Sequence, residues 1–213
     1  MANVYNQMFS INDKAVRVAL RDILEKKLKE YRKKDPKAEI FEELGVQHGT
    51  ARIDYAIING EMCGYEIKSD RDTLERLPEQ VREFSEVFDK LTLVVGKRHL
   101  YHAIHEIPEW WGVMLVKENG YGKLVLQTIR KPDQNSTQKG ISVARLLWRE
   151  EALNILEQRN KADGIRSKPR EFVYQRLVEV FDSDFKALKE HVSSTLISRE
   201  GWRSDPQLVT NGG

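Results

Sequence analysis

Apolar residues recur every three or four positions through the first part of the chain. This spacing predicts a long amphipathic helix, which Asn12 or Asp13 can cap at its start and which Pro36 ends. The helix would present one apolar stripe to the rest of the fold. The stripe consists of Val16, Leu20, Ile23, Leu24, Leu28 and Tyr31.

Short apolar runs follow, and they are typical of β-strands. Residues 40–46 predict one strand, and residues 52–68 predict a hairpin around Asn59 and Gly60. A second amphipathic helix is expected from about residue 73 to residue 88, before a continuous apolar strand at 91–95. Strand, helix, strand in this order is a right-handed crossover, so we expect the strands on either side of the helix to be parallel neighbours.

The rest of the chain divides into a short α/β part and a helical part. A short helix near residues 98–105 and strands at 112–116 and 123–129 complete a mixed sheet with flanking helices, which is an α/β fold. Residues 132–137 indicate a linker, and the later pattern is helical. We therefore expect one domain over residues 1–132 and a helical C-terminal region over residues 141–213. The helices of that region are expected at about 143–158, 171–181 and 184–197.

The register of the hairpin decides whether its charged residues meet. A strict two-residue turn at Asn59 and Gly60 would put Asp54 and Glu66 on opposite faces. A three-residue loop with Gly60 in the left-handed conformation puts Asp54 opposite Gly64 and diagonal to Glu66, on one face. We predict the second register.

That register separates apolar from charged residues. The apolar face would consist of Ile53, Tyr55, Ile57, Cys63, Tyr65 and Ile67, and the other face of Arg52, Asp54, Glu66 and Lys68. Burying an unpaired ionised group costs several kcal/mol or shifts its pKa. Two carboxylates and a lysine on strands this apolar therefore indicate a bound cation or mutual pairing.

The composition indicates a globular protein of the reducing cytoplasm. The 213 residues, 40% of them hydrophobic, are enough to bury a sizeable core. The single cysteine, Cys63, excludes a disulfide framework and a multi-cysteine zinc site. The first residues lack the pattern of a signal peptide, and no apolar run approaches the roughly 20 residues of a membrane span.

The net charge of +2 hides an uneven distribution. Residues 36–90 carry 7 Lys or Arg against 13 Asp or Glu, whereas residues 1–35 carry 9 against 5 and residues 121–213 carry 16 against 12. An acidic centre that can hold cations, between basic flanks that can hold phosphates, fits an enzyme that acts on nucleic acid. The alternative is an ordinary charge-rich surface, which often shows such swings.

The order of predicted elements, with Asp54 on one strand and Glu66-Ile67-Lys68 on the next, resembles the PD-(D/E)XK nuclease superfamily. The resemblance covers roughly residues 10–130 and implies a restriction-endonuclease-like core with the element order α-β-β-β-α-β. Residues 52–54, 64–70, 77–80 and 88–89 resemble a little-characterised branch of small prokaryotic proteins within it.

The resemblance implies a magnesium site, with Mn²⁺ able to substitute. Asp54, Glu66 and the Ile67 carbonyl would be ligands, and Lys68 would position or deprotonate the attacking water and offset charge in the transition state. Hard oxygen ligands are those that Mg²⁺ prefers. The Pro-Asp dipeptide of the superfamily is absent, since Ile53 precedes Asp54.

Two further site residues follow from the same resemblance. An additional acidic ligand is expected before the hairpin, and Glu43 is our choice over its neighbour Glu42. Gln80 corresponds to the glutamine of a Gln-x-x-x-Tyr element that lies near the site in RecB-like members, although Phe84 replaces the tyrosine. A glutamine at the boundary of a helix would give the same pattern.

Five basic residues and one acidic residue occupy positions 159–170, between two predicted helices. This segment resembles the helix, loop, helix pattern of SAP-type DNA-binding modules, and Arg166, Lys168 and Arg170 are candidates for phosphate contacts. The alternative is a solvated basic loop.

The function expected from these residues is magnesium-dependent hydrolysis of phosphodiester bonds in nucleic acid, with DNA as the expected substrate. A non-catalytic nucleic-acid-binding module of the same fold is one alternative, although such a module does not need two carboxylates beside a phosphate. A protein-interaction domain is the other.

Overall fold

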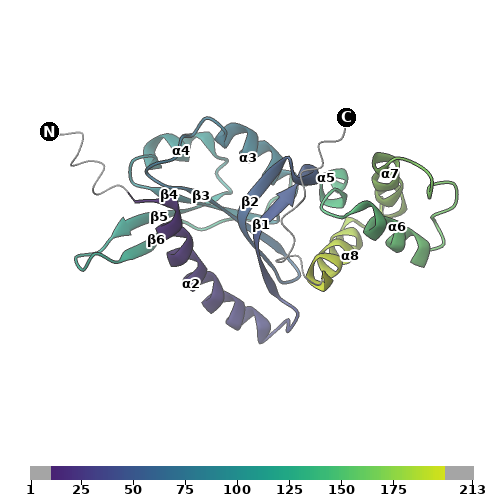
Figure 1. The fold of residues 1–213 in the computed structure, drawn as a ribbon, viewed down its shortest axis with the longest axis horizontal. Helices are drawn as coiled ribbons and strands as arrows, with labels where there is room; N and C mark the ends of the chain where they lie inside the picture. The colour runs from purple at the N-terminus through teal and green to yellow at the C-terminus, as the bar shows by residue number, and fades with distance from the viewer. Residues whose placement is uncertain (1–10, 200–213) are drawn as a thin grey trace.

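The computed structural model describes residues 11–199 and contains a six-stranded sheet with helices on both faces (Figure 1). The strands lie in the sheet in their order along the chain. β3 pairs with β4 and β4 with β5 in parallel, and the other pairs are antiparallel, so the sheet is mixed. The predicted α/β class and the element order α-β-β-β-α-β of its first part are confirmed.

The elements of the sheet and its flanking helices are α2 (Asp13–Arg32), β1 (Glu39–Val46), the 3-10 turn η1 (Gln47–Gly49), β2 (Ala51–Ile58), β3 (Met62–Lys68), α3 (Leu77–Ser85), β4 (Lys90–Gly96), α4 (Leu100–Glu106), β5 (Gly112–Glu118) and β6 (Leu124–Arg130). The C-terminal helices are α5 (Gly140–Ala144), α6 (Arg149–Gln158), α7 (Arg170–Val180) and α8 (Phe185–Ser198).

Each face of the sheet has its own apolar cluster. α2 begins where Asn12 Oδ1 accepts the Ala15 N–H at 2.9 Å, so Asn12 is the cap. The helix buries Val16, Leu20, Leu24 and Leu28 against one face. The other face packs against α3, α4 and the C-terminal helices, and Figure 1 shows α2 on the opposite side of the sheet from α3 and α4.

α3 is shorter than the sequence pattern predicts. The helix begins at Leu77 rather than near residue 73, because Pro78 occupies its first turn, where the missing N–H costs no helical hydrogen bond. Leu77, Gln80 and Phe84 are its buried residues. α3 therefore places one polar side chain within an otherwise apolar buried stripe.

The hairpin register differs from the prediction by two residues. Ile58 pairs with Met62, and Gly64 pairs with Ala56 rather than with Asp54. The predicted pairing was therefore wrong, and continuing the observed register brings Asp54 to the level of Glu66. A shift by two preserves the alternation of side chains between faces only as far as both strands stay regular.

The cause of the shift lies in the loop. The three loop residues are Asn59, Gly60 and Glu61, one position later than predicted. Asn59 closes the loop, since its N–H donates to the Glu61 carbonyl at 3.1 Å and its Oδ1 accepts the Glu61 N–H at 3.3 Å. Gly60 has a φ of +87°, so the predicted left-handed glycine is confirmed.

The predicted apolar face of odd-numbered residues is wrong at Ile53. Ile53 packs in the same cluster as Ala56, whereas Tyr55 packs in the cluster beneath α2. In a regular strand, two residues that are three positions apart lie on opposite faces. Ile53 and Ala56 lie on the same face, so the alternation of side chains in β2 is interrupted at Asp54. β1 changes face at the same level, where Glu43 has the positive φ of 52°.

The segment predicted as a linker packs along the chain that follows α3. The side-chain amide of Asn135 donates to the carbonyls of Ser85 at 2.6 Å and Phe88 at 2.8 Å, and Asn135 is buried. On α8, Lys189 forms an ion pair with the buried Asp89. These contacts fix the C-terminal helices to the sheet.

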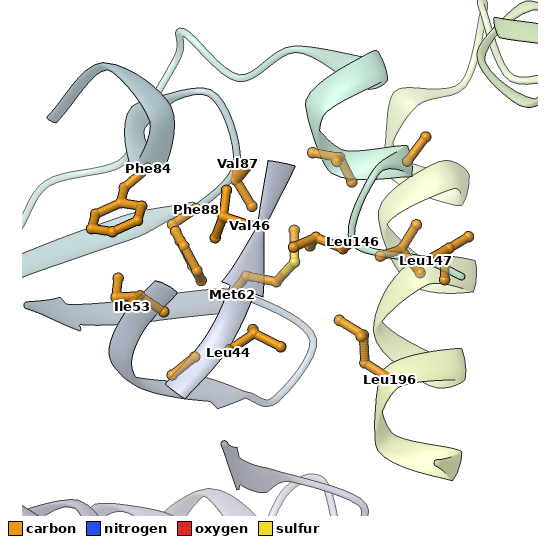
Figure 2. Close-up of a cluster of buried hydrophobic side chains, with 14 of the residues drawn as sticks. Leu44, Val46, Ile53, Met62, Phe84, Val87, Phe88, Leu146, Leu147 and Leu196 are labelled. Atoms are coloured by element: carbon orange, nitrogen blue, oxygen red, sulfur yellow. The ribbon is translucent and has the colours of Figure 1, made fainter. Parts of the chain in front are cut away.

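An apolar cluster completes the attachment. Leu146 and Leu147 after α5 and Leu196 on α8 belong to the same cluster as Leu44 and Met62 of the sheet (Figure 2). The C-terminal helices thus share the core on the α3 side of the sheet.

The single helix predicted over residues 143–158 is two helices, α5 and α6, with a break between them. The break is stabilised by side chains that bind its main chain. Tyr174 donates to the Leu147 carbonyl at 2.8 Å, and Glu151 accepts the Trp148 N–H at 2.7 Å. The apolar pattern continues across the break because Leu146 and Leu147 are buried there as well.

The Gly60→Val substitution tests the loop conformation. No atom outside the loop lies within 4 Å of a Cβ at this position, so the cost comes from placing a β-branched residue at positive φ. We expect the free energy of unfolding, measured in urea, to fall by about 1–3 kcal/mol. Gly120→Val is the control, because Gly120 has equally open surroundings and its φ is not positive. Equal losses in both variants would contradict the prediction.

Candidate active site

Asp54 lies where the pairing of β2 with β3 ends. The last pair is Tyr55 with Tyr65, and one residue further on Asp54 Oδ2 accepts the Ile67 N–H at 2.7 Å. The carboxylate thus takes the place of a main-chain acceptor. The N–H and C=O of one residue point to the same side of a strand, so the Ile67 carbonyl faces the same gap.

Glu66 is the most deeply buried charged residue of the site, with 3% of its surface exposed. Its Oε1 accepts a hydrogen bond from Lys68 Nζ at 3.0 Å and one from Gln80 Nε2 at 2.6 Å. Lys68 reaches Glu66 because residues two apart on a strand share a face. Gln80 comes from α3 on that same face, so the structure brings three of the predicted residues together.

One carboxylate oxygen of the site has no partner. Glu66 Oε2 and Gln80 Oε1 are buried and form no hydrogen bond within residues 11–199. An unsatisfied buried polar atom costs about 1–3 kcal/mol. A carboxylate oxygen left open in this way is the position at which a cation or a donor from a ligand would lower the free energy of the site.

Burial governs the charge state of both acids. Burial, together with the nearby Asp54 carboxylate, raises the pKa of Glu66 to about 8, although Lys68 and Gln80 favour the ionised form. Burial also raises the pKa of Asp54, to about 6, against the opposing effects of Arg17 and the Ile67 N–H. In the metal-free protein each acid therefore holds its proton more tightly than it does in water.

Arg17, on α2, is a site residue that the sequence pattern does not reveal. Its Nη2 contacts Asp54 Oδ1 and its Nη1 lies 2.7 Å from Glu43 Oε1. The sequence held one signal, since Asp13 and Arg17 are spaced i, i+4 on a helix and do pair at 2.7 Å. Nothing along the chain links that pair to Asp54, because the contact requires α2 to lie across β1 and β2.

The same contacts distinguish the two glutamates of β1. Glu43 shares the guanidinium of Arg17 with Asp54, whereas Glu42 is paired with Arg21. The structure therefore brings Glu43, and not Glu42, to Asp54. The positive φ of Glu43 accompanies this placement, and such backbone strain is found preferentially at functional sites.

The donor set suits a hard divalent cation. Asp54, Glu66 and the Ile67 carbonyl supply oxygen atoms, and Glu66 Oε2 is free to bind. Among residues 11–199 no three His, Cys, Asp or Glu side chains converge as a metal-binding group. The predicted set of Asp54, Glu66, Glu43 and the Ile67 carbonyl is therefore not assembled around one point, and Arg17 bridges Glu43 and Asp54 instead.

The predicted nucleic-acid contacts lie apart from this site. Arg166 and Lys168 lie in the segment between α6 and α7, and Arg170 is the first residue of α7; Figure 1 places this segment at the far end of the molecule from β3 and β4. Arg166 pairs with Glu157 at 2.8 Å, and Arg149 binds the carbonyls of Arg166 and Lys168. Their contact with phosphate stays a prediction.

A family model described as "Bacteriophage P4 protein cII" matches residues 12–205. The chain belongs to this family. The match includes the sheet, the candidate site and the C-terminal helices, so the P4 cII family spans both parts of the chain.

Protein cII of Enterobacteria phage P4 is a relative with 34% identity over 82 residues. These residues are 38% of this chain and 31% of the phage P4 protein, so the alignment spans about a third of the relative. No solved structure matches the chain. Between residues 11 and 199, no helix has the length and apolar composition needed to cross a membrane.

The raised pKa values predict how stability depends on pH. Between the ordinary pKa of Glu66, 4.5, and its folded value of about 8, the folded protein binds more protons than the unfolded chain. The free energy of unfolding should therefore fall as pH rises through this range, by up to roughly 1.4 kcal/mol per pH unit for each such group. Urea unfolding in EDTA from pH 5.5 to 8.5 measures it.

The control for this prediction is Glu66→Gln, which removes the titrating group and keeps a side chain of similar shape. Its stability should depend less steeply on pH, and it should exceed the wild type above pH 8. Parallel pH profiles for the two proteins would show that Glu66 is ionised without cost.

Proposed function

We propose that the protein is a magnesium-dependent nuclease that hydrolyses phosphodiester bonds of nucleic acid, DNA being the expected substrate. The observation that supports this proposal is the placement of Asp54 on the Ile67 N–H at the interrupted end of the β2–β3 pair, close enough to affect the ionisation of Glu66, which pairs with Lys68 and has its Oε2 buried and unpartnered. The resemblance to PD-(D/E)XK nucleases rests on the same residues. The proposal places the activity in the cytoplasm.

Each residue has a role that follows from its contacts. Asp54 and Glu66 hold the cation, and the hydrogen bond from the Ile67 N–H fixes the orientation of Asp54. Gln80 is a positioning residue, because it binds Glu66 Oε1 and leaves Oε2 open. Mg²⁺, when bound, supplies a Lewis acid and lowers the pKa of a water molecule.

Lys68 supplies positive charge at the reacting phosphate. Its Nζ is held by Glu66 Oε1 and its side chain is 10% exposed, so the ammonium is fixed and only partly hydrated. A preorganised charge in a poorly solvated site stabilises negative charge that develops in a transition state better than it would in water.

A nucleic-acid-binding module without catalysis is the second candidate, and one observation favours it. Arg17 pairs with both Asp54 and Glu43, so these acids can have a structural role. In this alternative, Arg166, Lys168 and Arg170 would carry the binding. A protein-interaction domain would follow if the chain bound neither divalent metal nor nucleic acid.

Incubation with labelled single- and double-stranded DNA and RNA tests the proposal. We expect cleavage with Mg²⁺ or Mn²⁺ and none with EDTA. Asp54→Ala and Glu66→Ala should each abolish cleavage while the protein stays folded, because each removes a ligand and also relieves the burial of a charge. Wild-type turnover in either variant would remove that residue from the mechanism, and binding without cleavage in the wild type would favour the second candidate.

Lys68→Ala should lower the cleavage rate without preventing Mg²⁺ binding, unlike Asp54→Ala and Glu66→Ala, which remove metal ligands. Calorimetric titration should show that Mg²⁺ binding survives or tightens, because a nearby positive charge is lost. The cleavage rate should fall by roughly 10² or more, as for other lost stabilisers of transition-state charge. Lys90→Ala is the control, since Lys90 pairs with Glu61 near the other end of β3. An unchanged rate for Lys68→Ala would assign Lys68 to a structural role.

A further inference from the structure

Arg17 is held by acids from three different elements. Its Nε lies 2.7 Å from Asp13 Oδ2 on α2, its Nη1 lies 2.7 Å from Glu43 Oε1 on β1, and its Nη2 contacts Asp54 Oδ1 on β2. The guanidinium is the cation around which these carboxylates gather. Its planar fork of donors can serve several acceptors at once, but it carries a single positive charge.

The oxygen of Asp54 that Arg17 contacts is the one that a metal ion would need. Asp54 Oδ2 is bound to the Ile67 N–H, so Oδ1 is the oxygen left for a cation. Arg17 takes Oδ1, and it takes Glu43 as well. A divalent cation that binds Asp54 and Glu43 would therefore have to occupy the space beside their oxygens that the guanidinium of Arg17 fills.

We infer that Arg17 and a divalent cation compete for Asp54 and Glu43, so that Arg17 must leave Asp54 before the metal binds there. The inference rests on the magnesium site of the proposed function and adds to it a residue of α2 that sets the metal affinity. At equal distance a divalent ion attracts each carboxylate about twice as strongly as a guanidinium does. It must first lose part of its water shell, which Mg²⁺ does reluctantly.

The guanidinium that leaves Asp54 remains near the site. Asp13 holds its Nε one helical turn away, and that contact does not involve Asp54 or Glu43. The freed nitrogens of Arg17 can then bind an anion, and guanidinium binds phosphate in a bidentate manner. Metal binding would thus release a phosphate-binding group next to the proposed catalytic residues.

The Arg17→Gln substitution tests the competition without any nucleic acid. We expect calorimetric titration with MgCl₂ to show a Kd at least tenfold lower than that of the wild type, which is about 1.4 kcal/mol. In EDTA at pH 8 the variant should have a lower Tm, because its carboxylates have lost their counter-ion, and Mg²⁺ should restore it.

Arg21→Gln is the matched control. Arg21 lies one turn further along α2 and pairs with Glu25 and Glu42, which are outside the proposed site. Its Kd for Mg²⁺ should equal that of the wild type. Arg17→Lys is a second variant that keeps the charge but loses the fork, and its Kd should lie between those of the wild type and Arg17→Gln.

Two outcomes would overturn the inference. One is that neither Arg17 variant binds Mg²⁺ more tightly than the wild type, and the other is that none of the proteins binds Mg²⁺. Tighter binding by Arg17→Gln, together with a wild type that cleaves no nucleic acid, would support the inference and reject the nuclease. Cleavage by the wild type with an unchanged Kd in the variants would reject the inference alone.

Discussion

The geometry of the site depends on one hydrogen bond, in which the Asp54 carboxylate replaces a main-chain acceptor for the Ile67 N–H. In a regular sheet, each main-chain N–H between two strands donates to a carbonyl of the neighbouring strand. A side-chain carboxylate can accept such an N–H only where the neighbouring strand bends away and its carbonyl is no longer in reach. The change of face at Asp54 and the positive φ of Glu43 supply that departure. Strain of this kind costs about 1–3 kcal/mol, and persists only where the surrounding structure enforces it.

The two carboxylates are held from opposite faces of the sheet. α2 lies on one face and supplies Arg17 to Asp54, and α3 lies on the other and supplies Gln80 to Glu66. The interruption of the sheet is the place where these two polar contacts meet. Each helix otherwise buries apolar side chains against the sheet. Each contributes one polar residue to the site, Arg17 from the edge of the buried face of α2 and Gln80 from the buried face of α3.

The C-terminal helices belong to the same structural unit by packing, although they are distant in sequence. Asn135 and Lys189 bind the chain between α3 and β4, and Leu196 packs with the residues around Met62 (Figure 2). This attachment lies on the α3 side, so it supports the helix that carries Gln80. The P4 cII family match includes both parts, which agrees with a single packed unit.

Much of the fold could be predicted because it depends on local patterns. Periodicity identified α2 and the strands, and the glycine in the hairpin loop was identified from its special backbone requirement. The register was wrong by two because Asn59 closes the loop through its own hydrogen bonds with Glu61, which the hairpin pattern does not specify. The break between α5 and α6 was missed because its stabilising partners, such as Tyr174, are far along the chain.

By itself, the sequence determined which groups carry charge on apolar strands, but strand alternation alone did not place Asp54, because β2 changes face at that residue. Only the tertiary structure decided which cation accompanies Asp54. Arg17 meets Asp54 across 37 positions of chain, and its partner Glu43 reaches it through a left-handed backbone conformation. Periodicity specifies the face of an element on which a residue lies. An ion pair between a helix and a strand also depends on the angle and position at which the helix crosses the sheet. The packing of the apolar clusters on the two faces of the sheet sets that crossing.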